Sequence, residues 1–194
     1  YCIMPSFNFG NIVNEKTLID FSLFSVIDSD RTDNEIILKN LEASDEVMNH
    51  IIRSMGWNGY KKTIDGETFI GYKNRTPSDV ESDGITEAVA YNQWIERFKD
   101  DERRFKKTLP VNSLSQSQYD GLLSLHWFTG SITEVGNEDR QFRIYDLIKE
   151  KKWDYVATAM ILGGRRRTQR QAESKIIMLA DYGQYKHRSL IKEQ

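Results

Sequence analysis

The sequence is poor in cysteine, proline and histidine: its 194 residues include one cysteine, three prolines and three histidines. The lone Cys2 excludes an intramolecular disulfide and any metal site built from several cysteines. His50, His126 and His187 are far apart in the chain and show no spacing typical of metal ligands. We therefore expect no metal and no other cofactor, and we interpret each histidine as structural or solvated.

Long apolar runs are also missing. No stretch approaches the roughly 18 consecutive apolar residues that a membrane-spanning helix needs, so we expect no membrane span. No basic stretch followed by an apolar run opens the chain, and no signal peptide is predicted. Hydrophobic residues make up 39% and charged residues 29% of the sequence, a balance typical of globular domains with a sizeable core.

The net charge of −2 hides an asymmetry between the two ends of the chain. Residues 1–50 carry nine acidic and three basic side chains, whereas residues 149–194 carry eleven basic and five acidic ones. Basic segments of this kind are typical either of solvated helix faces or of a surface that binds an anionic polymer, such as a cell-wall glycan or nucleic acid. No aromatic residues interleave the basic runs 149–152 and 165–167 in a nucleic-acid-binding pattern, so nucleic acid is not an expected partner.

Apolar periodicity and capping residues predict a mainly helical chain. In the first predicted helix, Ser44 is the expected cap and Gly56 the expected stop. The helix at 115–129 is apolar on nearly every side, which is typical of a helix at the centre of its domain. The predicted helices cover residues 44–55, 84–108, 115–129, 142–148, 153–162 and 165–179. The expected buried stripe of the second helix consists of Ala88, Tyr91, Trp94, Ile95, Phe98 and Phe105.

Residues 60–72 predict a β-hairpin. Asp65 and Gly66 form a preferred pair for a two-residue hairpin loop, because both central residues of that turn need a positive φ. Residues 1–40 lack clean helical periodicity and predict short strands or an extended arm. Helices with one small β region early in the chain indicate an α+β fold that is mainly α.

Several segments carry specific residue patterns. Residues 149–157 lead from a basic turn into a helix that opens with Trp-Asp. Residues 115–124 read Ser-Gln-Ser-Gln-Tyr-Asp-Gly-Leu-Leu-Ser, and residues 127–130 read Trp-Phe-Thr-Gly. Residues 84–87 read Gly-Ile-Thr-Glu before a long helix, and residues 170–173 read Arg-Gln-Ala-Glu near the end of the chain.

In order and spacing, these segments resemble the phage-type lysozymes, the T-even phage lysozyme-like muramidases of tailed bacteriophages. Residues 149–157 are similar to the family's turn into a Trp-Asp-Ala-Ala helix. Residues 115–124 are similar to its Gln-Phe-Asp-Ala-Leu-Val-Ser helix, and residues 127–130 to the Phe-Asn-x-Gly ending of that helix. Residues 84–87 match the start of the family's connecting helix. Residues 170–173 resemble its Arg-Arg-x-x-Glu pattern, with Gln169 in place of one arginine. Tyr60, Gly66 and residues 70–72 are similar to the hairpin pattern Tyr…Gly…Ile-Gly-Tyr.

The resemblance covers residues 44–183 and implies a lysozyme-like fold, with a small β-hairpin lobe and a helical C-terminal lobe. Residues 1–43 lie outside it, and we interpret them as an N-terminal extension or arm that is not part of the family. Residues 184–194 are left as a C-terminal tail. The resemblance also implies that the ligand, if the chain is catalytic or binds a glycan, is peptidoglycan.

In this family a glutamate, just before a glycine at the end of the helix that precedes the hairpin, acts as the general acid. Depending on the alignment, that glutamate falls here on Met55, Ser54 or Arg53. The family's hairpin aspartate falls on Lys62 or Thr63. None of these side chains is a carboxyl group, and a lysine disfavours a neighbouring oxocarbenium ion. The resemblance therefore stops at the positions that carry the chemistry.

The family's hairpin threonine falls on Phe69, with Thr68 beside it. We therefore expect a fold that is kept and a muramidase activity that is lost. The alternative is an active muramidase, either an endolysin or a tail lysozyme, that uses the displaced carboxylates of Glu67, Asp65 or Glu46. A polyanion-binding protein, acting through the basic segments, is a further alternative.

Trp57, Tyr60 and Thr68 are the candidate residues for binding a glycan, because exposed aromatic rings stack on sugars. Trp127 and Trp153 are interpreted as core residues. The resemblance implies a phage virion protein, a component of the tail or baseplate that is made in the host cytoplasm. Its expected partners are other phage structural subunits and peptidoglycan.

Overall fold

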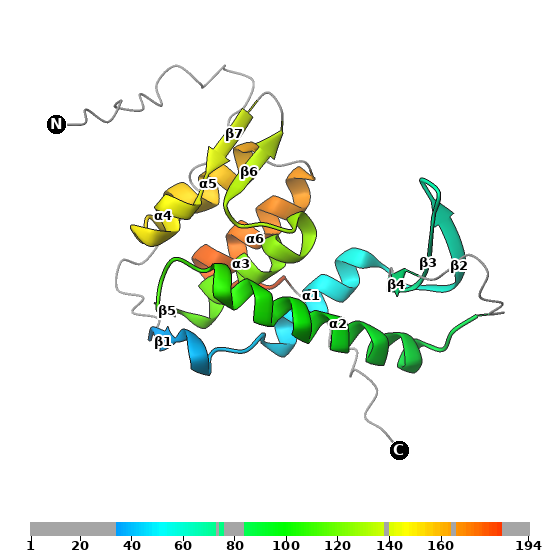
Figure 1. Ribbon diagram of the computed structural model, residues 1–194. Coiled ribbons are helices and arrows are strands. Elements are labelled where there is room, and N and C mark those ends of the chain that lie inside the picture. Colours follow the sequence, from blue (N-terminus) through cyan, green and yellow to red (C-terminus); the bar gives the residue numbers. More distant parts are fainter. Residues whose placement is uncertain (1–33, 73, 76–83, 138–139, 164–165, 184–194) are drawn as a thin grey trace. The chain divides into compact units, whose positions relative to one another are not determined.

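The computed structural model describes residues 34–72, 74–75, 84–137, 140–163 and 166–183 (Figure 1). Helices dominate this part of the chain, and the strands form three small sheets, so the predicted α+β class is confirmed. The helices are α1 (Asp45–Met55), α2 (Glu87–Thr108), α3 (Gln116–Thr129), α4 (Tyr145–Lys149), α5 (Trp153–Gly163) and α6 (Arg167–Leu179), with one 3-10 turn, η3 (Leu38–Asn40). None of the helices in these ranges is long and apolar enough to cross a membrane.

All three sheets are antiparallel; two of them pair consecutive strands, and the first joins segments that are far apart in the chain. The first joins β1 (Ile36–Ile37) to β5 (Ser113–Leu114). The second has the order β2 (Asn58–Ile64), β3 (Glu67–Gly71), β4 (Asn74–Arg75). The third joins β6 (Glu134–Asn137) to β7 (Arg140–Arg143). The core is therefore built by the helices, since sheets this small cannot enclose one.

Helix α1 begins and ends where the sequence predicts. The Ser44 hydroxyl accepts a hydrogen bond from the Val47 amide at 3.1 Å, which satisfies one of the free N–H groups at the start of the helix. Gly56 follows the last residue with φ of 75°, a value that a residue with a Cβ adopts at a cost. The buried face of α1 includes Val47, Ile51 and Met55.

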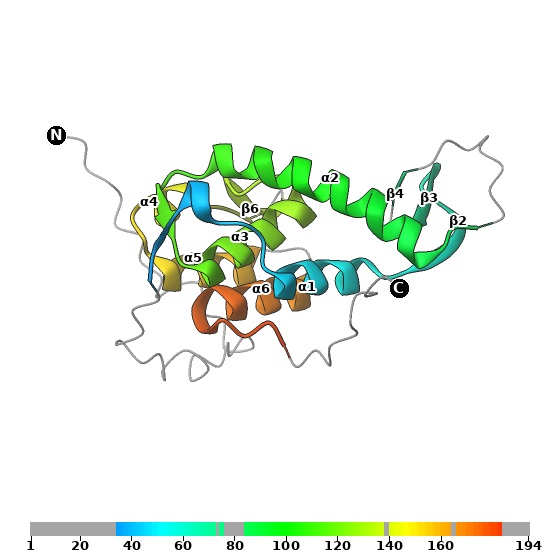
Figure 2. The same ribbon diagram turned by 90° about the horizontal axis from the view of Figure 1, so that it is seen from below.

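Helix α3 is buried on most sides, as predicted, and contacts α1, α2 and α6 (Figures 1 and 2). A capping box starts it: the Ser115 hydroxyl accepts from the Gln118 amide, and the Gln118 side chain accepts from the Ser115 amide. Gly121 faces α6 so closely that an added Cβ would collide with Ile177 and lie 3.1 Å from the carbonyl oxygen of Glu173. The close approach of α3 to α6 therefore requires a glycine at position 121.

Asp120 on α3 fastens two distant segments to this helix. Its carboxylate accepts hydrogen bonds from the Ser44 amide at 3.2 Å and from the Ser44 hydroxyl at 2.6 Å. It also accepts from the Tyr182 hydroxyl at 2.6 Å and from the Gln116 side-chain amide at 3.0 Å. Burial raises the pKa of Asp120 and these bonds act against the rise. One carboxylate thus holds the start of α1 and the segment after α6 in place.

The predicted hairpin is formed by β2 and β3. Its turn residues Asp65 and Gly66 have φ of 53° and 80°, which confirms a loop in which both central residues have positive φ. The Tyr72 hydroxyl donates to Glu87 at 2.6 Å, and the Arg97 guanidinium donates to the Tyr72 carbonyl at 3.4 Å. Tyr72 therefore joins the end of the hairpin to α2.

Three details of the predicted helices are wrong. Phe142 lies in strand β7, and α4 begins only at Tyr145. The apolar residues at positions 142 and 144 fit the period of a strand as well as that of a helix, so the spacing alone does not distinguish them. Ala88 is exposed and Ala90 is buried in its place. Helix α6 begins at Arg167, two residues later than expected.

Residues 34–43 join the helices through several contacts. Ile36 pairs with Leu114, and the Leu38 amide donates to the Asn112 carbonyl at 2.9 Å. The Ala43 amide donates to Glu102 at 2.7 Å. The predicted arm up to residue 33, His187 and the predicted tail at 184–194 lie outside the described residues. The domain boundary at residue 43 stays a prediction.

Candidate functional site

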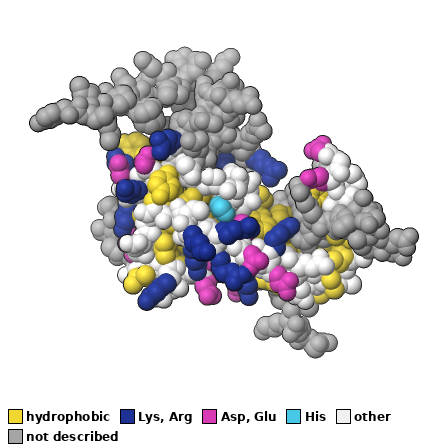
Figure 3. Space-filling model, viewed as in Figure 1, with side chains coloured by type: hydrophobic (Ala, Val, Ile, Leu, Met, Phe, Trp, Pro, Cys, Tyr) yellow, Lys and Arg dark blue, Asp and Glu magenta, His cyan; other side chains and the backbone are white. Residues whose placement is uncertain are grey.

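A groove with a volume of about 380 Å³ lies at the C-terminal end of α1, beside α2 and α3. Three helices supply most of its lining, and one further residue comes from the start of α6. Figure 3 shows Lys and Arg side chains gathered over α2, with acidic side chains between them. The residues that line the groove are Met55, Arg97, Asp101, Arg104, His126, Trp127, Phe128, Gly130 and Arg166.

Met55 is the last residue of α1 and is only 9% exposed. The indole N–H of Trp127 donates to its sulfur at 3.3 Å. Ser54, the other non-basic position onto which the family's acid falls, is exposed. A thioether has no proton to release and accepts hydrogen bonds only weakly. At this end of α1 the groove therefore has an apolar wall.

Asp101 is the single carboxylate among the described residues that line the groove. It accepts from the Arg104 guanidinium at 3.0 Å, and its second oxygen lies 3.6 Å from Nε2 of His126. Burial acts to raise the pKa of Asp101, but the hydrogen bonds and charges of His126 and Arg104 outweigh it and the pKa is lowered. Asp101 is thus an anion at neutral pH and cannot serve as a general acid there.

Arg97 is held at the side of the groove by two contacts. Its guanidinium carbon lies 5.2 Å from the centroid of the Trp127 ring, a cation–π distance. Its Nη2 donates to the Tyr72 carbonyl at 3.4 Å, as described for the hairpin. Trp127 in turn packs against Trp94 and Phe98, so the wall of the groove continues into the core. Trp127 is half-buried, in partial agreement with its prediction as a core residue.

The hairpin places its predicted site residues on an exposed strand pair. Lys62 and Thr63 are exposed, and Phe69 and Thr68 are half-buried. Lys62 pairs with Phe69 in the register, and the hydroxyls of Thr63 and Thr68 lie 3.3 Å apart. None of these four residues lines the groove.

Two of the predicted glycan-binding residues present aromatic surface to solvent. Trp57 is 42% exposed and Tyr60 is 71% exposed. The ring of Trp57 packs against that of Tyr72 with centroids 5.4 Å apart, which fixes its orientation. Its indole also lies over Gly59, where an added Cβ would be 3.5 Å from the ring. Both exposed rings belong to the segment that leads from the end of α1 into β2.

The three displaced carboxylates lie apart from the groove. Glu46 is exposed in the first turn of α1, about nine residues and so ~13 Å along the helix from its end. Asp65 belongs to the hairpin turn and Glu67 follows it, and both are exposed. The structure does not bring any of them together with Met55, and the predicted roles of all these residues stay predictions.

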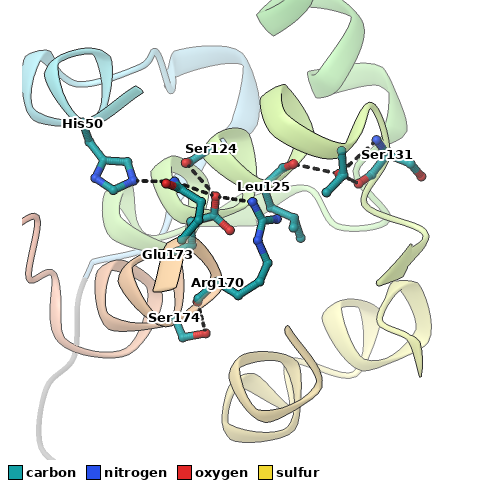
Figure 4. Close-up of polar contacts among 9 residues, drawn as sticks. His50, Ser124, Leu125, Ser131, Arg170, Glu173 and Ser174 are labelled. Atoms are coloured by element: carbon teal, nitrogen blue, oxygen red, sulfur yellow. Dashed lines mark hydrogen bonds and ion pairs between the residues drawn. The ribbon is translucent and has the colours of Figure 1, made fainter. Parts of the chain in front are cut away.

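Helices α3, α6 and α1 share a buried polar cluster (Figure 4). Glu173 is 0% exposed and accepts from Arg170 at 2.8 Å and from Ser124 at 3.1 Å. Burial raises the pKa of Glu173 to about 7, against the effect of Arg170. Gln169 lies 3.1 Å from Glu173 and 3.0 Å from the buried His50. The Arg-x-x-Glu pattern noted in the sequence therefore holds α6 against α3.

The sequence patterns do not single out the groove residues on α2. Arg97, Asp101 and Arg104 are spaced i, i+4 and i+7, which puts them on one face of a helix. That spacing is a usable signal, but it is equally typical of a solvated helix face. The described residues contain no cluster of His, Cys, Asp and Glu that could hold a metal ion.

Solved structures match this fold, although no protein-family model and no curated protein matches the sequence. The endolysin of the Escherichia coli O157:H7 phage FAHEc1 is 16% identical, with a TM-score of 0.60, and the match covers 74% of this chain and 98% of that one. The active form of P1 phage endolysin Lyz is 13% identical over 73% and 88% of the two chains, with a TM-score of 0.58. The muramidase domain of SpmX from Asticaccaulis excentricus is 16% identical over 71% and 98%, with a TM-score of 0.55. The predicted lysozyme-like fold of the phage type is confirmed.

Proposed function

We propose that this chain is a lysozyme-like domain that binds peptidoglycan without hydrolysing it. The fold is shared with phage endolysins and with a muramidase domain, which supports peptidoglycan as the ligand. Fold alone does not fix activity, which depends on the residues that line the groove. The observation that carries the proposal is Met55 at the end of α1, with its sulfur bonded to the Trp127 indole.

Hydrolysis of a glycosidic bond needs a proton donor at the leaving oxygen and usually a second carboxylate for water or the sugar. Met55 has no proton to give, and Asp101 is kept ionised by Arg104 and His126. A single ionised carboxylate supplies neither the pair of groups nor the difference in their pKa values that this chemistry requires. The groove therefore favours binding over cleavage.

Hydrolysis by displaced carboxylates is the competing function. It requires Glu46, Asp65 or Glu67 to reach a bound sugar chain, and all three are exposed residues that do not line the groove. A general acid must lie within hydrogen-bond reach of the oxygen that it protonates, and none of the three is placed beside the groove. No observation on these residues favours the competing function.

Trp57 and Tyr60 support the binding half of the proposal. Their exposed rings lie at the base of the hairpin, and the contact of Trp57 with Tyr72 holds one ring in a fixed orientation. A preoriented ring loses little entropy when a sugar stacks on it. Thr68 adds a hydroxyl on the neighbouring strand. In this proposal the hairpin contacts the sugar chain of peptidoglycan, and the groove binds the groups attached to that chain.

The proposed place of the domain is a phage particle, as a tail or baseplate component bound to other structural subunits. Its support is the phage origin of several structural neighbours. The measurement that tests it is mass spectrometry of purified particles from a phage that encodes this chain. The proposal requires the chain to be present in stoichiometric amounts, and its absence from the particles would remove the virion role.

Cosedimentation with insoluble peptidoglycan tests the binding. We expect the chain to be retained by sacculi, and Trp57→Ala and Tyr60→Ala each to weaken retention, since a stacked aromatic is worth roughly 1–3 kcal/mol at a desolvated contact. Tyr155→Ala is the matched control, because Tyr155 is 51% exposed but lies on α5. Absence of retention at low salt, or an equal effect of all three substitutions, would remove the proposed binding surface.

A further inference from the structure

The groove carries more positive than negative charge. Arg97, Arg104 and Arg166 bring three guanidinium groups to it, and Asp101 brings the single carboxylate of the described lining. Burial lowers the pKa of Arg97, yet an arginine side chain stays protonated in proteins at neutral pH. A neutral sugar chain gains nothing from this excess charge, whereas an anionic ligand is attracted by it.

The three arginines differ in how many contacts their guanidinium groups already make within the protein. Arg104 donates to Asp101 at 3.0 Å. Arg97 stacks on Trp127 and donates to the Tyr72 carbonyl. Arg166 is exposed and does not cap the helix that it precedes, and within the described ranges no ion pair joins it to a carboxylate. Its guanidinium is therefore available to a ligand in the groove.

The backbone at Arg166 is also unusual. Its φ of 63° and ψ of 56° place it in the left-handed region, which is costly for a residue with a Cβ and rarely adopted outside glycine and asparagine. Such conformations persist where the surrounding structure enforces them, often beside a binding site. Arg166, which has this conformation, also lines the groove.

We infer that the groove is selective for the carboxylates of peptidoglycan stem peptides, with Arg166 as the principal contact and Arg97 as a second positive charge beside it. Guanidinium groups bind carboxylates through paired, charge-assisted hydrogen bonds. The inference rests on the proposed function, because it names the part of the polymer that the same site binds. It predicts a domain that distinguishes peptide-bearing peptidoglycan from neutral glycans.

The test compares native sacculi with sacculi whose free carboxylates have been converted to amides by carbodiimide and ethanolamine. The sugars and peptide lengths are the same in both, and only the charge differs. We expect amidation to weaken binding on the order of tenfold at physiological salt, the effect of losing one charge-assisted contact. Chitin, a neutral polymer of N-acetylglucosamine, is expected to bind as weakly as the amidated sacculi.

Variants of two adjacent arginines supply the matched control. Arg166→Glu is expected to lose roughly tenfold in affinity for native sacculi and little for amidated ones, and Arg166→Gln to lose somewhat less. Arg167→Glu makes the same charge change at an exposed residue outside the groove lining, where screening leaves an effect of about twofold or less. Circular dichroism and the melting temperature verify that all three variants are folded.

The outcomes separate this inference from the proposed function. Equal binding of native and amidated sacculi, or equal losses in Arg166→Glu and Arg167→Glu, would overturn the carboxylate selectivity and leave peptidoglycan binding intact. Failure of native sacculi to retain the wild-type chain at low salt would overturn both. Selective loss in Arg166→Glu, confined to sacculi with free carboxylates, supports the inference.

Discussion

The indole nitrogen of Trp127 lies 3.3 Å from the sulfur of Met55, and both side chains line the same groove. The donor is half-buried and the acceptor is almost fully buried, so the contact is partly shielded from water. Met55 is one of the three residues onto which the general acid of phage-type lysozymes falls in the sequence comparison, and its side chain has no proton to release. The contact is structural, and it can be measured as such.

A double-mutant cycle measures that contact. Met55→Leu keeps the volume of the side chain but removes the acceptor, and Trp127→Phe removes the donor. We expect each substitution to lower the free energy of unfolding by about 0.5–2 kcal/mol, with a coupling of about 0.5 kcal/mol or more in the double variant. The measurement is urea denaturation. Strict additivity of the two losses would mean that the hydrogen bond contributes nothing to stability.

Gly121 is expected to be intolerant of any side chain. Gly121→Ala brings a Cβ into contact with Ile177 and with the backbone oxygen of Glu173, so α3 and α6 must move apart. We expect a loss of about 1–3 kcal/mol in the free energy of unfolding, although alanine is the better helix former. Gly59→Ala is the control, since its Cβ would make only ordinary contacts with Trp57. Equal melting temperatures of the two variants would show that the helices tolerate the extra atom.

The buried cluster on α6 predicts two opposing pH effects. Burial, with the charge of Arg170, lowers the pKa of His50 from 6.5 to about 4. The unfolded chain then binds the extra proton in this window, so the His50 contribution to stability is lost as pH falls from about 6.5 to about 4. Burial raises the pKa of Glu173 from 4.5 to about 7, so the folded chain binds the extra proton and stability is gained as pH falls through that window.

Because these windows overlap, the two effects offset each other in the wild-type chain. His50→Gln removes one of them and keeps a polar group beside Gln169. Relative to the wild type, we expect this variant to gain about 2–3 kcal/mol in the free energy of unfolding between pH 7 and pH 4, since one pKa unit corresponds to about 1.4 kcal/mol. Urea denaturation of both proteins at several pH values measures the difference. Parallel stability curves would show that His50 is not the titrating group.

Local sequence signals predict much of this fold. The Asp65–Gly66 turn, the Ser44 and Ser115 caps and the end of α2 before Pro110 all depend on residues close together in the chain, and the structure has each of them. The sequence does not predict the β6–β7 hairpin, because each of its strands has a single apolar residue, Val135 or Phe142, and too little alternation to indicate a strand.

The groove depends on contacts across the fold rather than on local pattern. Arg97, His126 and Arg166 come from three different segments of the chain, and their meeting follows from the packing of α2, α3 and α6. By contrast, the expected loss of the family's acid rests on the sequence alone, because every alignment places that glutamate on a residue without a carboxyl group, Met55, Ser54 or Arg53. The sequence therefore predicts that the general acid is lost, and only the structure shows which charged side chains line the groove beside Met55.

The release of reducing sugar ends from purified peptidoglycan distinguishes a domain that binds the polymer from one that hydrolyses it. The wild-type chain is incubated with native sacculi under conditions in which a phage endolysin is active, alongside Glu67→Gln and Glu46→Gln variants. We expect no release above the protein-free control for any of the three proteins, while the wild-type chain still cosediments with the sacculi. Release by the wild-type chain that either substitution abolishes would contradict this expectation and would establish an active muramidase with displaced carboxylates.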